Sequence, residues 1–496
     1  MATIQNTAGM SLAAIAQQLT PGATPHQELR SKGTDLYVKQ GTALFTNVQS
    51  RTDHRNSALA IVLRAIEQDL GVTPAVAQRF MQRVISGGQP GQITAGDLSR
   101  LSKAVELAGQ FDPSKANNSA FRGRIAESLV HRGLTEAEAV DIVRALGGTT
   151  TRDLFQALET NDMAALGRLV NALPNTPETV DALLQIESAL VAKADTGATT
   201  PPVLTVASHE VFHTKRTEAM EHILHAKLDG NTTPQLAVLS QLPKGEYWRL
   251  LMDGMHQGRG DKFFFDRSKG YMASMLAGLD MVVDKAGARL TVEMIKDLHK
   301  VSTTSVTYEL PVGTSALRSS DFQIAGSVKV RPNVWGVCKN FSERGMQELQ
   351  ALRTDLQAQV PSRKYFVDEN LVADKSRDDQ VQSWSAGLNF DAGLTTEVED
   401  LMQYSIDRGE REISAARTPD EKLGAIVDTC RRLGCIHPFK DANGRLMMFL
   451  VLNKLLMDNG FPPTILQDQG HMIGLSRSEL VALIKAGQNR VELLVP

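Results

Sequence analysis

The chain is poor in cysteine, in aromatic residues and in net charge, and each shortage excludes a class of protein. Its 496 residues include three cysteines, Cys338, Cys430 and Cys435, with no Cys-x-x-Cys pair, which argues against a disulfide framework or a cysteine zinc cage. The formal net charge of −3 provides no bulk attraction to nucleic acid or to an anionic membrane. No apolar run reaches the roughly 18 residues of a membrane-spanning helix, so we expect no transmembrane segment.

The first residues carry no secretory signal. Met1–Gln18 lacks a basic region, an apolar core and a small-residue cleavage site, and its polar composition predicts a disordered leader over residues 1–25. Such a composition also suits the leaders of proteins that bacterial injection systems secrete into a host cytoplasm, with a secretion chaperone bound at the N-terminus. Residence in the cytoplasm of the producing cell is the other interpretation.

What the chain does have is helical periodicity. Aromatic residues make up only 5% of it, and apolar residues recur at helix spacing, which together favour a mainly α fold. We expect a helical N-terminal module over 26–193, a linker over 194–202 (ADTGATTPP), a helical connecting region over 203–270 and an all-helical core domain over 271–496. A β-hairpin around Gly326 is the predicted exception, because β-type residues flank this glycine.

One segment, 418–466, combines strong helix signals with polar residues of catalytic types. Thr418 and Glu421 form a predicted capping box at the start of a helix that ends near Gly434. A short polar loop follows, and residues 446–457 are apolar nearly all round, which predicts a buried second helix. The loop therefore opens a buried helix, whose first turn presents unpaired N–H groups and a positive dipole end to an anion.

The loop residues match what transfer of a phosphate-containing group requires. Asn443 and Gly444 lie at the helix start, and Arg445 adds a bidentate cation for phosphate oxygens. Asp441 is an oxygen ligand suited to Mg²⁺, and His437 can accept a proton near neutral pH. A hairpin with a polar, solvated loop is the plain alternative, but this combination within nine residues favours a catalytic site.

The segment Ile436–Arg445, IHPFKDANGR, resembles the Fic signature HPFx(D/E)GNGR. Agreement extends to LTVEMIKDLHKV (290–301), LRSSDFQIAG (317–326), FPPTIL (461–466) and SRSELVALIKAG (476–487), so the resemblance covers roughly residues 271–495. It implies a Fic-type nucleotidyltransferase, similar to injected bacterial virulence effectors, that moves AMP from ATP onto a Ser, Thr or Tyr hydroxyl of a host protein such as a small GTPase.

The resemblance also implies a role for each matching residue. His437 would deprotonate the target hydroxyl and Asp441 would hold Mg²⁺. The donor's phosphates would be cradled by Ala442, Asn443, Gly444 and Arg445. Pro438 and Phe439 would anchor the loop. A β-hairpin flap would align the target segment by strand addition; it consists of Ser320, Asp321, Phe322, Gln323 and Ile324.

Two positions depart from the family pattern. Ala442 replaces the usual glycine, and Met448 replaces a second arginine that grips the terminal phosphate in AMP-transferring members. Methionine offers neither the charge nor the donors of arginine, so transfer of phosphocholine, UMP or phosphate is the alternative to AMP. We find no (S/T)xxxE(G/N) motif, so we expect no inhibitory glutamate.

Two other function classes remain open. A Fic core that no longer turns over would act as a non-catalytic binding effector. His209 to His213 reads HEVFH, a literal HExxH zinc motif, although Arg216 and Lys215 follow it where metal peptidases of one class need a glycine turn. We expect these histidines to lie on an exposed surface helix without metal.

Overall fold

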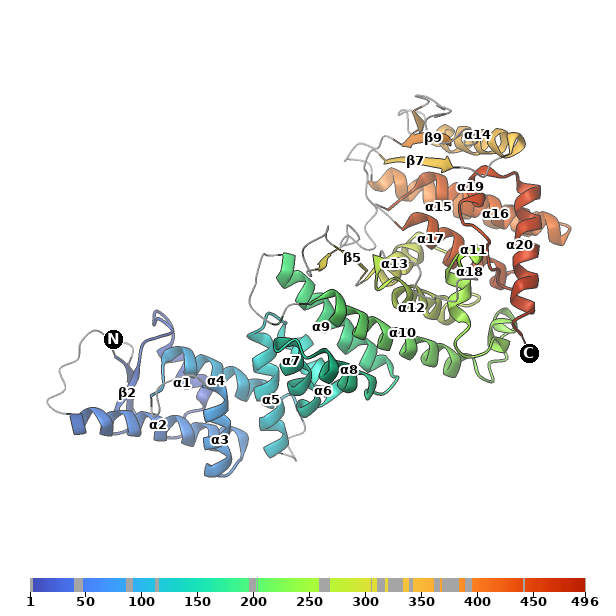
Figure 1. Ribbon diagram of the computed structural model, residues 1–496. Coiled ribbons are helices and arrows are strands. Elements are labelled where there is room, and N and C mark those ends of the chain that lie inside the picture. Colours follow the sequence, from blue (N-terminus) through green and yellow to red (C-terminus); the bar gives the residue numbers. More distant parts are fainter. Residues whose placement is uncertain are drawn as a thin grey trace. The chain divides into compact units, whose positions relative to one another are not determined.

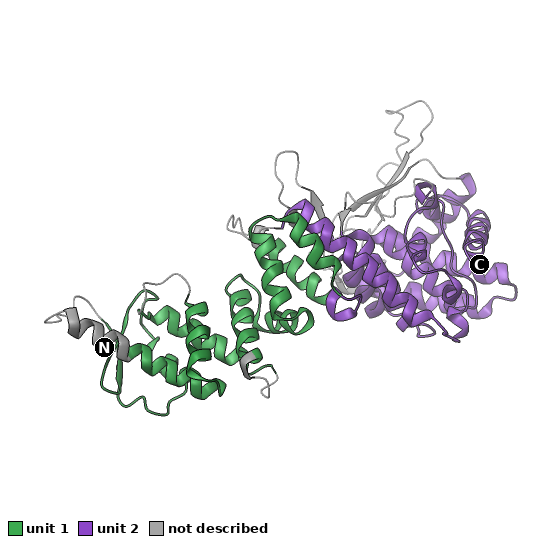
Figure 2. Ribbon diagram, turned by 60° about the horizontal axis from the view of Figure 1, so that its bottom comes forward, with its two compact units in different colours: residues 1–173, 181–193, 200–203 green, residues 174–180, 194–199, 204–496 purple. Residues whose placement is uncertain are grey.

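The computed structural model divides the chain into two compact units, which are considered separately (Figures 1 and 2). Unit 1 comprises residues 1–173, 181–193 and 200–203, and unit 2 comprises 174–180, 194–199 and 204–496. The residues that the structure describes are 3–39, 48–85, 92–111, 116–195, 202, 204–257, 268–304, 306–309, 317–319, 333–338, 342–360, 366–367, 383–388, 395–439 and 442–495.

Unit 1 is a helical module with a small sheet at its start. Strands β1, β2 and β3 form an antiparallel sheet in the order β1-β3-β2, and helices follow one another along the rest of the unit (Figure 1). Its elements are β1 Thr3–Ile4, α1 Leu12–Leu19, β2 Leu29–Lys32, β3 Asp35–Val38, α2 Val48–Leu70, α3 Pro74–Val84, α4 Ala95–Ala108, α5 Ala116–Val130, α6 Glu136–Leu146, α7 Gly148–Glu159, α8 Met163–Asn171 and α9 Pro177–Asp195.

The expectation of a disordered leader over residues 1–25 is wrong for its described part. Ser11 caps α1 by accepting a hydrogen bond from the Ala14 N–H, and Leu12, Ile15 and Leu19 are fully buried. These apolar residues recur at helix spacing within a segment whose average composition is polar, so they bury one face against the unit's core. The Leu12 N–H donates to Asp69 Oδ2 of α2 at 2.7 Å, which ties α1 to the rest of the unit.

Unit 2 is also mainly α, as predicted. Its described strands form two three-stranded sheets, in the orders β4-β5-β6 and β7-β9-β8, while the hairpin expected around Gly326 lies outside the described residues. The elements are α10 Val206–Leu228, η2 Pro234–Leu236, η3 Leu239–Gln241, η4 Tyr247–Leu251, α11 Gly254–Gln257, β4 Ser268–Lys269, α12 Tyr271–Asp284, α13 Val292–Thr303, β5 Thr307–Glu309, β6 Leu317–Ser319, β7 Asn333–Cys338, α14 Glu343–Ala358, β8 Phe366–Val367, β9 Ser383–Leu388, α15 Thr395–Ala415, α16 Pro419–Ile436, α17 Asn443–Arg445, η6 Leu446–Val451, α18 Leu452–Asp458, α19 His471–Gly474 and α20 Arg477–Glu492.

Two helical segments form the centre of unit 2. The predicted capping box at Thr418 and Glu421 is confirmed and starts α16. The predicted buried helix is confirmed as well: α17, η6 and α18 run continuously over 443–458, and every residue of η6 is at most 2% exposed. We call this continuous helical segment, 443–458, the rod. Its middle part, η6, is a π-helix, a local widening of the helix that often accompanies functional sites.

The predicted connecting region, 203–270, is part of the same core rather than a separate segment. Residues of α10, η2, η3 and η4 belong to the hydrophobic cluster that also holds α12 and α16. The Tyr271 hydroxyl donates to the Leu251 carbonyl at 2.6 Å, which joins the start of α12 to η4. The predicted linker, 194–202, lies mostly outside the described residues.

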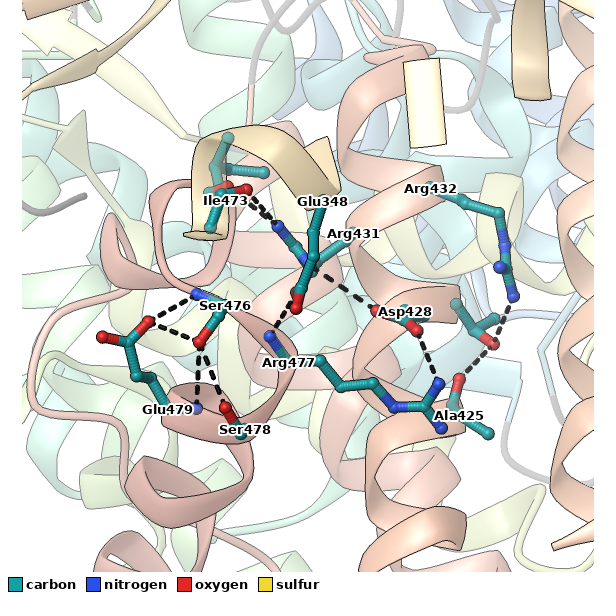
Figure 3. Close-up of polar contacts among 12 residues, drawn as sticks. Glu348, Ala425, Asp428, Arg431, Arg432, Ile473, Ser476, Arg477, Ser478 and Glu479 are labelled. Carbon is teal, nitrogen blue, oxygen red and sulfur yellow. Dashed lines mark hydrogen bonds and ion pairs between the residues drawn. The ribbon is translucent and has the colours of Figure 1, made fainter. Parts of the chain in front are cut away.

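Helix α16 is fixed to α14, α19 and α20 by ion pairs and hydrogen bonds (Figure 3). Arg431 is fully buried and donates to the Ile473 and Gly345 carbonyls at 3.5 and 3.3 Å, and its Nη1 lies 3.4 Å from Glu348 Oε2. Arg477 pairs with Asp428 at 3.2 Å, and the Arg477 backbone N–H donates to Glu348 at 2.6 Å. These contacts restrict how α16 can shift, and with it the loop at its C-terminal end.

Within the described residues, none of the helices has the length and apolar character that crossing a bilayer requires.

Candidate functional site

The loop between α16 and α17 begins with a histidine in a left-handed conformation. His437 has φ 52° and ψ 55°, and its N–H donates to the Leu433 carbonyl at 3.3 Å, which ends α16. A residue with a Cβ pays about 1–2 kcal/mol for this conformation. The strain is located at the residue predicted to be the catalytic base, whose side chain is half-buried rather than enclosed.

Phe439 holds the loop to the core. Its side chain is 1% exposed, and its ring stacks on that of His299 in α13, with a centroid distance of 3.9 Å and an interplanar angle of 8°. His299 is itself 2% exposed. The stack joins the motif loop to a helix more than a hundred residues earlier in the chain, so the loop position depends on α13.

Asn443 closes the loop through its side chain. Its Oδ1 accepts from the Phe439 N–H at 2.8 Å, and its Nδ2 donates to the Phe439 carbonyl at 2.7 Å. The amide therefore pairs both backbone groups of one residue and is 2% exposed. The sequence assigned Asn443 to phosphate contact, whereas here its side chain serves the loop, and an anion would meet the backbone at the helix start.

Ala442 and Gly444 shape that helix start. Ala442 adopts φ 61° and ψ 6°, a left-handed conformation that explains why glycine is usual at this motif position. Gly444 is exposed, and a Cβ added to it would lie 3.1 Å from Gln469 Oε1. Glycine thus leaves the first turn open beside the segment that precedes α19.

Arg445 lies over an aromatic ring. Its guanidinium carbon is 4.6 Å from the centroid of Tyr271, a cation–π contact that orients the side chain. Burial raises the pKa of Asp253 to about 7, a shift that the charge of Asp468 increases and that the Gln469 N–H and the charge of Arg445 oppose. The Gln469 N–H donates to Asp253 Oδ1 at 2.6 Å.

No pattern in the sequence pointed to Tyr271, Asp253 or Gln469. They come from α12, from the residue before α11 and from the segment before α19, and only the fold brings them to Arg445. Asp253 stands in what the sequence predicted to be a connecting region, so its position beside the motif could not be read from spacing.

Met448 is part of the core. It is 2% exposed, and its terminal methyl group would lie 3.3 Å from a Cβ added to Gly434 of α16. Position 448 therefore contributes a packing contact between the rod and α16, and no cation points from it toward the loop.

Several predicted site residues lie outside the described residues. These are Asp441 and the flap residues Ser320, Asp321, Phe322, Gln323 and Ile324. Across the part of the chain that the structure describes, no three His, Cys, Asp or Glu side chains gather as metal ligands. The magnesium site at Asp441 therefore remains a prediction.

The HExxH motif, His209 to His213, belongs to no cluster of three possible metal ligands among the described residues. Its two histidines lie on a buried face of helix α10. His209 and His213 are 0% and 2% exposed, with ring centroids 6.2 Å apart. His213 Nε2 accepts from the Ala273 N–H at 3.3 Å, which occupies a nitrogen that a zinc ion would need, whereas Glu210 is exposed. The expectation of a surface helix is wrong because α10 packs against α12.

Comparison with known proteins gives one informative result. No family model matches the chain. Over 279 residues, or 53% of the chain, it is 28% identical to the phosphocholine transferase AnkX of Legionella pneumophila. The match spans 29% of the length of that relative. Over about half its length, the chain is therefore similar to an enzyme that transfers a phosphate-containing group.

Proposed function

We propose that the chain is a Fic-type transferase that moves phosphocholine from a nucleotide-linked donor onto a Ser, Thr or Tyr hydroxyl of another protein. The observation that carries the proposal is the loop from His437 to Arg445, which unites a histidine, an open helix start and an oriented arginine. Similarity to a phosphocholine transferase supports the choice of the transferred group.

In this proposal His437 acts as the general base. It takes the proton of the target hydroxyl, whose oxygen then forms a bond to the phosphorus of the phosphocholine group. The bond between that phosphorus and the bridging oxygen of the diphosphate breaks, and a nucleoside monophosphate leaves. The restraints on α16 and the stack of Phe439 on His299 would keep the histidine in place during the reaction.

The helix start would bind the donor's phosphates. The backbone N–H groups around Gly444 and the guanidinium of Arg445 supply donors and positive charge, and the ring of Tyr271 limits the positions that Arg445 can adopt. Asp441 is our proposed Mg²⁺ ligand; the proton transfer and the phosphate contacts do not depend on that assignment. The target, which the family resemblance suggests is a host protein, would be aligned by the segment 320–324.

Position 448 favours phosphocholine over AMP. AMP transfer from ATP, the expectation from the sequence, calls for a second arginine that grips the terminal phosphate. Met448 is buried against α16 instead, so a donor with a shorter and less charged chain of phosphates suits the site better.

The proposal is tested by incubating the purified full-length chain with a lysate of eukaryotic cells, Mg²⁺ and either CDP-choline or ATP. Intact-mass spectrometry should find proteins that gain one phosphocholine with CDP-choline. The His437→Ala variant should lose the transfer by at least about 10²-fold, the contribution typical of a general base. His131→Ala, which changes an exposed histidine in unit 1, should transfer normally.

Each outcome separates the alternatives. AMP adducts from ATP alone would keep the transferase and refute the transferred group. Equal adducts from the wild type and His437→Ala would refute the assigned chemistry. Absence of any adduct with both donors would favour a non-catalytic binding protein.

A further inference from the structure

Unit 1 contains a group of arginines that transferase chemistry does not use. Arg83 lies in the last turn of α3, Arg122 and Arg124 lie on α5, and Arg152 follows the first turn of α7. Helix α5 packs against both α3 and α7. Arg152 pairs with Asp153 at 2.6 Å, and in the described part of the chain the other three have no ion pair. Positive charge is therefore in excess at this place.

Arg124 is the buried member of the group. It is 9% exposed, its guanidinium carbon lies 4.8 Å from the centroid of the Phe121 ring, and among the described residues no hydrogen bond or carboxylate satisfies it. Burial, together with the charges of Arg83 and Arg152, lowers the pKa of Arg124 to about 10. A buried cation without an anionic partner is costly to the folded state, so an anion bound here would relieve that cost.

The start of α7 adds backbone donors beside the same phenylalanine. Gly147 precedes the helix with φ 80°, and the helix has neither a side-chain cap nor an acidic residue in its first turn. A Cβ added to Gly148 would lie 2.7 Å from Phe121 Cε1 and 3.5 Å from Arg122 Cγ. Gly148 at the start of α7 and the guanidinium of Arg124 thus both lie close to one ring, that of Phe121. The sequence over the first turn, Gly148–Thr151, also supplies threonine hydroxyls.

We propose that Arg83, Arg124, Arg152 and the first turn of α7 form a binding site for a phosphomonoester. This ligand class carries up to two negative charges and three acceptor oxygens, which matches several guanidinium donors and a helix N-terminus. The group can belong to the headgroup of an inositol phospholipid or to a soluble inositol phosphate. The site would serve localisation or regulation through unit 1, and it does not depend on the proposed transferase activity.

The test measures binding by the full-length chain to three probes. These are inositol hexakisphosphate and inorganic phosphate by isothermal titration calorimetry, and phosphatidylcholine vesicles with or without phosphatidylinositol 4-phosphate by flotation. Arg83→Gln, Arg124→Gln and Arg152→Gln should each weaken binding by about tenfold or more, because each removes charge-assisted hydrogen bonds. Arg168→Gln is the matched control, since Arg168 is an exposed arginine on α8 of the same unit.

The arms distinguish the source of the phosphate and decide the proposal. Binding of the soluble probes supports a soluble ligand, and flotation only with the phosphoinositide supports a lipid headgroup. The proposal is overturned if the chain binds none of the probes. It is also overturned if Arg168→Gln weakens binding as much as the other variants do, because the loss would then follow from the overall charge of the chain. If Arg124→Gln lowers the melting temperature, the binding measured for Arg83→Gln and Arg152→Gln decides whether the site exists. Both arginines are exposed, so their replacement leaves the core intact.

Discussion

Asn443→Ala should destabilise unit 2 and abolish transfer together, because one buried amide fixes the motif loop. The change removes the partners of both the Phe439 N–H and the Phe439 carbonyl, which Asn443 meets at 2.8 and 2.7 Å. Asn443 and Phe439 are 2% and 1% exposed, so water cannot easily replace the lost bonds. At about 1–3 kcal/mol for each of these two buried groups left unpaired, the expected loss is about 2–6 kcal/mol.

Tryptophan fluorescence during urea denaturation measures this loss selectively. All three tryptophans of the chain, Trp248, Trp335 and Trp384, belong to unit 2, so the signal does not report unit 1. Asn443→Asp is the informative comparison: it keeps the acceptor for the Phe439 N–H but turns the donor into a second oxygen that faces the Phe439 carbonyl, so it should be at least as destabilised as Asn443→Ala. An unfolding free energy for Asn443→Ala within about 0.5 kcal/mol of wild type would refute the reasoning.

Three further changes test other parts of the site. Ala442→Gly should stabilise unit 2 by about 0.5–1 kcal/mol in urea denaturation, because it relieves a left-handed alanine; a destabilised variant would contradict this. Met448→Arg should cost at least about 3 kcal/mol by burying a charge and should not create AMP transfer; AMP adducts from this variant would show that position 448 can reach the donor. Because burial raises the pKa of Asp253 to about 7, the folded chain retains a proton that the unfolded chain releases, so this carboxyl makes stability fall as pH rises from about 4 to 7, by up to about 4 kcal/mol. Asp253→Asn should flatten that slope and stabilise the protein at pH 8; an unchanged slope would show that Asp253 ionises normally.

Local signals in the sequence predicted the motif region well. The capping box at Thr418 and the apolar run over 446–457 each act within a few residues, and the helices start and pack where these signals indicate. The same reasoning failed for α1, because the polar average over residues 1–25 concealed an apolar stripe of a single helix face. Composition describes a segment as a whole, whereas burial depends on which face each residue occupies.

Contacts between distant segments could not be predicted. The stack of Phe439 on His299 and the position of Asp253 beside Arg445 depend on how α13 and η4 pack around the rod, and no spacing in the sequence encodes this. The contacts of Asn443 escaped prediction for a related reason: the motif identifies the residue, but only the coordinates show that its amide pairs with the backbone of Phe439.

Because the Asn443 side chain pairs with the backbone of Phe439, the amide proton of Phe439 reports the opening of the motif loop. The Phe439 N–H is bonded to Asn443 Oδ1 rather than to a helix or a sheet, so it can exchange with deuterated solvent only when that bond opens. Its exchange rate would therefore follow the opening of the motif loop separately from the unfolding of α16. A bound donor that holds the loop closed would slow this one proton before it slows those of the surrounding helices.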